Sequence, residues 1–175
     1  MSIFSDEYIP WAFLGCVCFR YVYVLHCTWL VNSAAHLWGE KPYDKSIKPK
    51  ENSSVIYLAF GEGYHNYHHT FPWDYSASEL GWNGNFNLTT ALIDFFAWTG
   101  LAYDLKKATP KVIHARQQRS GDPKSIQFKR SKLWVIKDWI LGILITTSSL
   151  WIAMGFRHII LSWIMGCQNL YIWFN

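Results

Sequence analysis

The chain has 175 residues, of which 51% are hydrophobic and 18% aromatic, and its formal net charge is +4. The length suffices for one domain with its own core, or for half of a larger domain. This density of Trp, Tyr and Phe argues against an ordinary soluble domain. It is typical of proteins at a membrane interface, where aromatic rings lie between lipid and water.

A first apolar stretch covers residues 9–31 and is interrupted by Arg20 and His26. A helix needs about 20 residues to cross the hydrocarbon core of a bilayer, so this stretch predicts a transmembrane helix. An arginine within a span is costly unless it reaches the interface or faces another helix. We therefore expect helix 9–31 to be one member of a bundle.

Residues 32–132 are polar and mixed in composition, with Pro and Gly turn signals and short apolar stretches. Helical spacing of apolar residues within 88–105 predicts one helix there, and we interpret 32–132 as a water-facing helical cap. Many of its Lys and Arg residues lie between 106 and 132, flanked by apolar segments. That position favours an anionic membrane surface over nucleic acid as the partner.

Orientation follows from the same charges. Basic residues near the ends of spans stay on the cytoplasmic side, so the cap is predicted to be cytosolic. Two sequons, at Asn52 and Asn87, would be glycan acceptors only in the lumen.

The last part of the chain, residues 133–175, is apolar again. Residues 139–156 contain no charged side chain, which makes them a spanning candidate at the lower length limit. The tail is interpreted either as an extra transmembrane helix or as translated non-coding sequence from a faulty gene model. The sequence favours neither.

Histidines carry the most informative pattern. Asn32 and His36 follow the first apolar stretch, and His65, His68 and His69 lie close together further on. Spacings of three and four place side chains on one face of a helix. We therefore expect the second group to project together, and Asn32 and His36 to form a pair at a helix end.

Imidazole suits iron, copper, nickel and zinc, and no cysteine or carboxylate cluster accompanies these histidines. The pattern lacks the Glu-x-x-His repeats of soluble di-iron bundles. It also lacks the His-Glu-x-x-His of zinc proteases, because Glu62 precedes the group. Isolated histidines are usually satisfied polar residues, and His26, His114 and His158 are interpreted so. Three imidazoles on one face favour a metal site.

Several motifs resemble, in order, the C-terminal half of animal membrane-bound acyl-CoA desaturases, of the stearoyl-CoA type and its insect delta-9 and delta-11 relatives. The resemblance runs from about Trp11 to Asp122. It rests on Asn32-Ser33-Ala34-Ala35-His36, Lys41-Pro42-Tyr43-Asp44, the run from Gly61 through His65-Asn66-Tyr67-His68-His69 to Pro72, Asp74-Tyr75-Ser76-Ala77-Ser78-Glu79, and Gly100-Leu101-Ala102-Tyr103-Asp104.

The resemblance implies an all-α fold, with integral membrane helices and a cytosolic helical cap that carries a histidine-rich di-iron half-site. It implies iron as the cofactor, with two ions in the intact enzyme. The residues at matching positions are the iron ligands His36, His65, His68 and His69, then Asn32, which reaches one iron through water, and Thr28 and Trp29, which line the acyl tunnel.

In that family, oxygen-dependent insertion of a double bond into a long-chain fatty acyl-CoA takes place at the endoplasmic reticulum membrane. The implied partners are acyl-CoA, O2, cytochrome b5 with its NADH-dependent reductase, and the lipid bilayer. No nucleic acid is expected. The histidine motifs of the multi-pass protein would face the cytosol.

The family also needs two earlier histidine boxes, on the half of the enzyme that precedes these motifs, and this chain does not supply them. The chain is therefore expected to be a fragment that is incomplete as an enzyme. The alternative is a catalytically inactive, truncated paralogue that acts as a membrane interaction partner of full-length desaturases. A different histidine-box enzyme, such as a hydroxylase or a sterol-type oxidase, is disfavoured by the motifs at 32–36 and 76–79.

Overall fold

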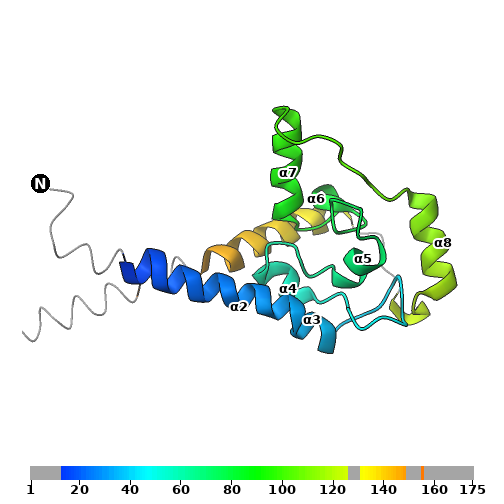
Figure 1. Ribbon diagram of the computed structural model, residues 1–175, viewed down its shortest axis with the longest axis horizontal. Coiled ribbons are helices and arrows are strands. Elements are labelled where there is room, and N and C mark those ends of the chain that lie inside the picture. The colour runs from blue at the N-terminus through cyan, green and yellow to red at the C-terminus, as the bar shows by residue number, and fades with distance from the viewer. Residues whose placement is uncertain (1–12, 126–130, 149–154, 156–175) are drawn as a thin grey trace, which may run out of the picture. The chain divides into compact units, whose positions relative to one another are not determined.

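The computed structural model describes residues 13–125, 131–148 and 155 (Figure 1). The chain divides into two compact units, one made of Met1–Tyr23 with Thr147–Asn175 and the other of Val24–Thr146. The second unit contains the histidine motifs.

All regular elements among the described residues are helices, and none is a strand, which confirms the predicted all-α class. Residue 51 forms isolated bridges with residues 40 and 64. The elements are the π-helix η1 (Phe13–Phe19), α2 (Arg20–Asn32), α3 (Ala34–Leu37), α4 (Ser53–Leu58), α5 (His65–Thr70), α6 (Gly81–Gly84), α7 (Leu88–Trp98), α8 (Pro110–Ser120), the 3-10 helix η2 (Pro123–Ser125) and a helix over 132–148.

The first apolar stretch is helical where it is described, through η1 and α2. Within the described ranges, no helix has both the length and the apolar character that crossing a bilayer requires. The predicted spans 9–31 and 139–156 each include residues outside those ranges. They stay predictions, as do the limits 32–132 and 133–175.

Asparagine caps explain where two helices begin. The Asn52 side chain accepts a hydrogen bond from the Val55 amide at 3.0 Å, and that of Asn87 accepts one from the Thr90 amide at 2.9 Å. The Asn87 amide group also donates to the Ser76 carbonyl, and the residue is 2% exposed. The folded structure therefore uses the Asn87 side chain. The absence of a glycan at Asn87 would not show on which side of a membrane residues 32–132 lie.

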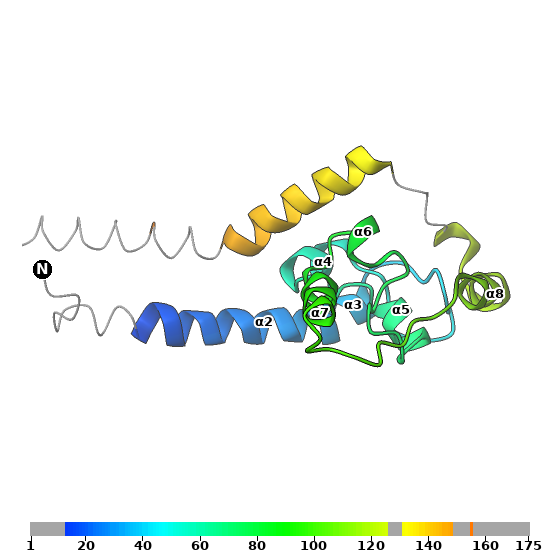
Figure 2. The same ribbon diagram turned by 90° about the horizontal axis from the view of Figure 1, so that it is seen from above.

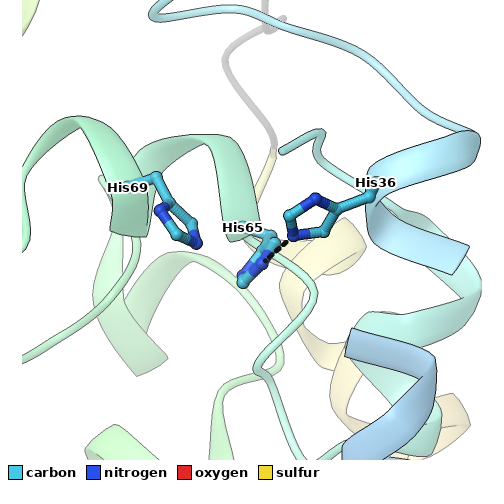
Figure 3. Close-up of side chains that lie close together, drawn as sticks. All are labelled: His36, His65 and His69. Carbon is cyan, nitrogen blue, oxygen red and sulfur yellow. Dashed lines mark hydrogen bonds between the residues drawn. The ribbon is translucent and has the colours of Figure 1, made fainter. Parts of the chain in front are cut away.

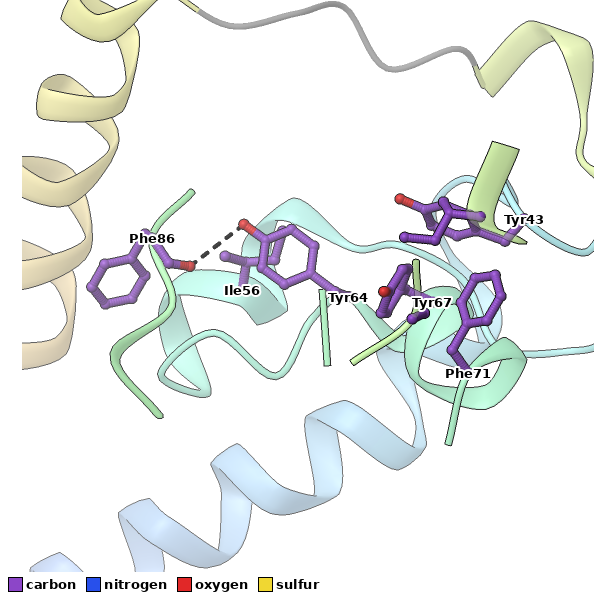
Figure 4. Close-up of a cluster of buried hydrophobic side chains, with 8 residues drawn as sticks. Tyr43, Ile56, Tyr64, Tyr67, Phe71 and Phe86 are labelled. Carbon is purple, nitrogen blue, oxygen red and sulfur yellow. Dashed lines mark hydrogen bonds between the residues drawn. The ribbon is translucent and has the colours of Figure 1, made fainter. Parts of the chain in front are cut away.

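The core is built around α5 (Figure 4). Its buried side chains include Tyr43, Ile56, Tyr64, Tyr67, Phe71 and Phe86. The rings of Tyr67 and Phe71 lie 4.8 Å apart, and Tyr43 meets Tyr67 at 5.0 Å. Tyr67 and Phe71 thus anchor α5 to the core, whereas its histidines at 68 and 69 remain exposed.

A second cluster joins the end of the first apolar stretch to α4. Ala35 is fully buried against Val55 and Ala59, with Leu30 and Val31 packed beside them. The small side chains of Ala34 and Ala35 allow close approach of the two helices. The contact places His36, the next residue, beside the start of α5.

Buried polar groups hold the loops around α5. The Asn66 oxygen accepts from the amides of Tyr43 and Asp44, at 2.9 and 3.1 Å. Its nitrogen donates to the carbonyls of Asp44 and Pro49, each at 2.9 Å. The Asn66 side chain therefore makes hydrogen bonds with four backbone groups of the 43–49 loop, which would otherwise be costly to bury.

Candidate metal centre

The histidine group forms where the end of α3 meets the start of α5. The Nε2 atoms of His36 and His65 lie 2.9 Å apart, and the His69 ring centroid lies 4.4 Å from that of His65 (Figure 3). One ring nitrogen from each of the three lies within 4.8 Å of the other two. His36 thus meets two histidines that follow it by 29 and 33 positions in the sequence.

The fourth predicted ligand lies beside this group. The ring centroid of His68 is 5.4 Å from that of His69 and 6.1 Å from that of His65. Its side chain is exposed and does not belong to the three-nitrogen group. The structure therefore brings together His36, His65 and His69, and the ligand role of His68 stays a prediction.

Asn32, Thr28 and Trp29 all lie in the last turns of α2. The Asn32 side chain donates to the Thr28 carbonyl at 3.2 Å, and the Thr28 hydroxyl donates to the Val24 carbonyl at 3.0 Å. The Trp29 ring is exposed and meets His26 edge-on at 5.7 Å. The water-mediated role of Asn32 and the tunnel roles of Thr28 and Trp29 stay predictions.

The surroundings of His65 and His69 favour their neutral forms. Burial, together with the neighbouring imidazoles of His69, His36 and His68, lowers the pKa of His65 to about 4. Burial also lowers the pKa of His69, with contributions from His68 and His36. A neutral imidazole has a lone pair available for a metal, so the group is competent to bind near neutral pH.

The donor set fits a transition-metal ion. Imidazole nitrogens suit iron, copper and zinc, and this three-residue group contains no thiolate or carboxylate.

Glu51 holds the helix that bears the histidines, a role that sequence reasoning did not identify. The Tyr64 side chain does not cap α5. Instead, Oε1 of Glu51 accepts from the Tyr67 amide at 2.8 Å, within the first turn of the helix. Among the described residues, its Oε2 has no hydrogen-bond partner. No spacing in the sequence indicates this contact, because Glu51 caps a helix that begins 14 residues later.

The surroundings of Glu51 favour the protonated form of its carboxyl group. Burial, with a smaller contribution from nearby Glu79 and Glu40, raises its pKa to about 8, against the opposing effect of hydrogen bonds from the amides of Tyr67 and Asn66. The buried oxygen without an acceptor role is consistent with a neutral carboxyl.

One of the basic residues between 106 and 132 makes contacts within the folded structure. Arg116, in α8, forms an ion pair with Asp44, whose side chain is almost fully buried. The Gln117 amide, also in α8, donates to Glu79 at 3.1 Å, and the Tyr43 hydroxyl donates to the same carboxylate at 2.7 Å. These contacts attach α8 to the 43–49 loop and thereby to α5.

No protein-family model matches the chain. Several curated proteins are similar to it. The chain is 60% identical over 107 residues to the acyl-CoA Delta(11) desaturase of Trichoplusia ni, covering 61% of this chain and 30% of that protein. It is 61% identical over 104 residues to the acyl-CoA Delta-9 desaturase of Acheta domesticus, covering 59% and 29%. It is 53% identical over 131 residues to the stearoyl-CoA desaturase of Mesocricetus auratus, covering 70% and 36%.

The chain is a relative of the acyl-CoA desaturases. The resemblance predicted from the sequence motifs is thereby confirmed. The chain spans about a third of the length of these curated relatives. The Delta(11) and Delta-9 desaturases are equally similar to it, at 60% and 61% identity. Similarity over this segment therefore does not distinguish the position of a double bond.

Proposed function

We propose that the protein to which this chain contributes is an acyl-CoA desaturase, an oxidoreductase that uses O2 to insert a double bond into a long-chain fatty acyl-CoA. The observation that carries the proposal is the convergence of His36, His65 and His69 in a chain about 60% identical to desaturases over the matched residues. The reaction requires a metal-based oxidant because the methylene C–H bonds of an acyl chain are unactivated.

His36, His65 and His69 would hold iron, and by resemblance His68 and Asn32 would complete their share of the ligands. Iron, when bound, would supply the redox chemistry that the removal of hydrogen requires. The residues of this chain would orient and support the ligands: Glu51 and Asn66 fix the start of α5, and the packing of Ala35 on α4 fixes His36. Such support beyond the ligands themselves is what tunes metal affinity.

The finer parts of the proposal come from the resemblance. Thr28 and Trp29 would line the tunnel that holds the acyl chain in one register, and cytochrome b5 with its reductase would deliver electrons. The protein would lie in the endoplasmic reticulum membrane, with the histidines on the cytosolic side. The basic residues between 106 and 132, apart from Arg116, support that orientation.

A chimera tests the proposal without needing any other part of the natural protein. In the Acheta domesticus Delta-9 desaturase, the matched 104-residue segment is replaced by the corresponding residues of this chain. The chimera is expressed in yeast that lacks its own desaturase. We expect growth without added unsaturated fatty acid, and new monounsaturated acids in the lipid profile.

Two variants of the chimera make the result specific. His65→Ala removes the buried member of the three-nitrogen group and is expected to abolish activity. His114→Ala, at an exposed position of α8, is the matched control and is expected to keep it. A well-expressed chimera that forms no unsaturated acid, or an active His65→Ala variant, would contradict the proposal.

For the 175-residue chain by itself we expect iron in less than stoichiometric amount and no desaturation when acyl-CoA, NADH and cytochrome b5 are supplied. Metal affinity rises with the number of ligands and with their supporting shell, and the resemblance assigns further ligands to the preceding half of the enzyme. Metal analysis after detergent purification, together with an activity assay, checks this.

A further inference from the structure

The helix over 132–148 buries an aspartate and a glycine, whereas many of its large apolar side chains are exposed. Asp138 is 2% exposed and Gly142 is buried. The side chains of Leu133, Ile136, Ile140 and Leu141 are exposed, with fractions from 45% to 64%. A surface helix of a water-soluble protein has the opposite distribution, with the apolar stripe facing the core.

Asp138 attaches this helix to the body at a defined point. Its Oδ1 accepts from the Tyr57 hydroxyl at 2.5 Å, and its Oδ2 accepts from the Phe86 amide at 2.6 Å. Tyr57 belongs to α4, and Phe86 precedes α7. A buried carboxylate is costly unless donors satisfy it, so these two contacts favour one position of the helix along the body.

The packing around Phe86 fixes the same position. A Cβ at Gly142 would lie 2.2 Å from the Phe86 ring, so glycine alone permits this approach. The Trp139 ring lies 5.1 Å from that of Phe86, and its Nε1 donates to the Trp82 carbonyl at 3.0 Å. Figure 2 shows the helix, yellow to orange, passing α4 and α6, and Figure 4 shows the Phe86 ring against it.

The charges at the outer side of the helix indicate what covers it. Lys132 and Lys137 are exposed on the helix, and Lys124 lies shortly before it. An apolar arc with cations near one end complements an anionic bilayer, in which apolar side chains enter the acyl region and ammonium groups reach the headgroups. A second copy of the same face would bring like charges together, which disfavours self-association.

We propose that helix 132–148 is a lipid-contacting helix, with Leu133, Ile136, Ile140 and Leu141 in the acyl region of an anionic membrane. Asp138 and Gly142 dock it on the histidine-bearing body, residues 33–125. This inference concerns a segment beyond the resemblance to desaturases, which ends near residue 122. It does not depend on the proposed activity.

A fluorophore at Ile140 tests the lipid contact. The full chain, with its four cysteines replaced by alanine, carries Ile140→Cys labelled with an environment-sensitive dye, in vesicles of phosphatidylcholine and phosphatidylglycerol. We expect quenching by nitroxide-labelled lipid and protection from iodide. The control, His114→Cys in α8, is expected to be quenched by iodide instead. Iodide quenching at Ile140, protection from both quenchers (cover by protein, including a second copy), or lipid quenching at both sites would each overturn the proposal.

Hydrogen exchange tests the docking. Asp138→Ala removes the acceptor of the Phe86 amide, which should then exchange at least about tenfold faster. Asp138→Asn keeps one oxygen acceptor and should show a smaller increase. The Thr90 amide, which Asn87 caps, is the internal control and should not change. Unchanged exchange at Phe86, or equal acceleration at Thr90, would show that Asp138 does not hold the helix at this point.

Discussion

The histidine-bearing body, residues 33–125, has many buried polar side chains, whereas the helix over 132–148, which the structure describes throughout, has one, Asp138. In the body, several side chains each satisfy groups from distant loops. Asn66 bonds the 43–49 loop, Asp74 bonds residues 67 and 108, and Glu51 caps α5. In the helix, Asp138 makes the comparable contacts.

The difference explains why one region has a recognisable sequence and the other does not. A side chain that serves three or four specific donors cannot be exchanged for another type without leaving polar groups unsatisfied. Many positions of the body therefore require one particular type of side chain. The helix over 132–148 needs an inward stripe with one carboxylate and one glycine, and many apolar residues fit its outer face.

Asp74→Ala should have the largest effect on the body. The carboxylate accepts from the Tyr67 hydroxyl at 2.7 Å, the Ala108 amide at 2.8 Å, and the amide and hydroxyl of Ser76 at 2.9 and 2.6 Å. Its loss leaves buried donors without an acceptor, and we expect destabilisation of about 3–5 kcal/mol. Thermal unfolding in detergent, followed by circular dichroism, measures it. A loss below about 1 kcal/mol would remove the contrast between the two regions.

Gly142→Val should have the next largest effect and tests the helix. The added side chain would overlap the Phe86 ring, and overpacking of this kind costs about 1–3 kcal/mol. Ile140→Val, on the exposed face of the same helix, is the matched control and should change stability by less than about 0.5 kcal/mol. Equal effects of the two substitutions, again from unfolding midpoints, would mean that the helix has no fixed face against the body.

A pH dependence should distinguish Glu51 from the other buried carboxylates. Its pKa in the folded chain is about 8, above the value of about 4.3 for an exposed glutamate. The folded state therefore binds this proton more tightly than the unfolded state does. The contribution of Glu51 to stability is therefore greatest below about pH 4, and it is lost as the pH rises towards about 8.

We expect a measurable loss of stability across that window. Glu51→Gln keeps an oxygen acceptor for the Tyr67 amide and cannot ionise, so it should flatten the profile. Denaturant unfolding at several pH values measures the slope. A profile that is equally steep in the Gln variant would assign the dependence to other groups.

The sequence predicted the helical class. That His36 shares a site with His65 and His69 was implied by the resemblance to desaturases, because helical spacing relates only His65 to His69. It did not predict the cap by Glu51 or the roles of Asn66 and Asp138, because these contacts join residues far apart in the chain. It also predicted a helix over 88–105, which is confirmed in part: α7 covers Leu88–Trp98, and residues 99–105 are not helical. The exposure of Leu92, Phe95 and Phe96 could not be foreseen, since helical spacing does not reveal whether a partner is present.

The smallest effect should come from the exposed ion pair between Lys106 and Asp104. Their charged atoms are 3.9 Å apart, and the side chains are 68% and 75% exposed. In water such a pair gains little, because solvent screens the charges and ordering two side chains costs entropy. Lys106→Ala should therefore change the unfolding midpoint negligibly, by less than about 0.5 kcal/mol in free energy. Arg116→Ala provides the contrast, because it leaves the buried Asp44 carboxylate without its ion-pair partner and should cost several times more. Similar losses in the two variants would show that burial does not set the strength of ion pairs in this body.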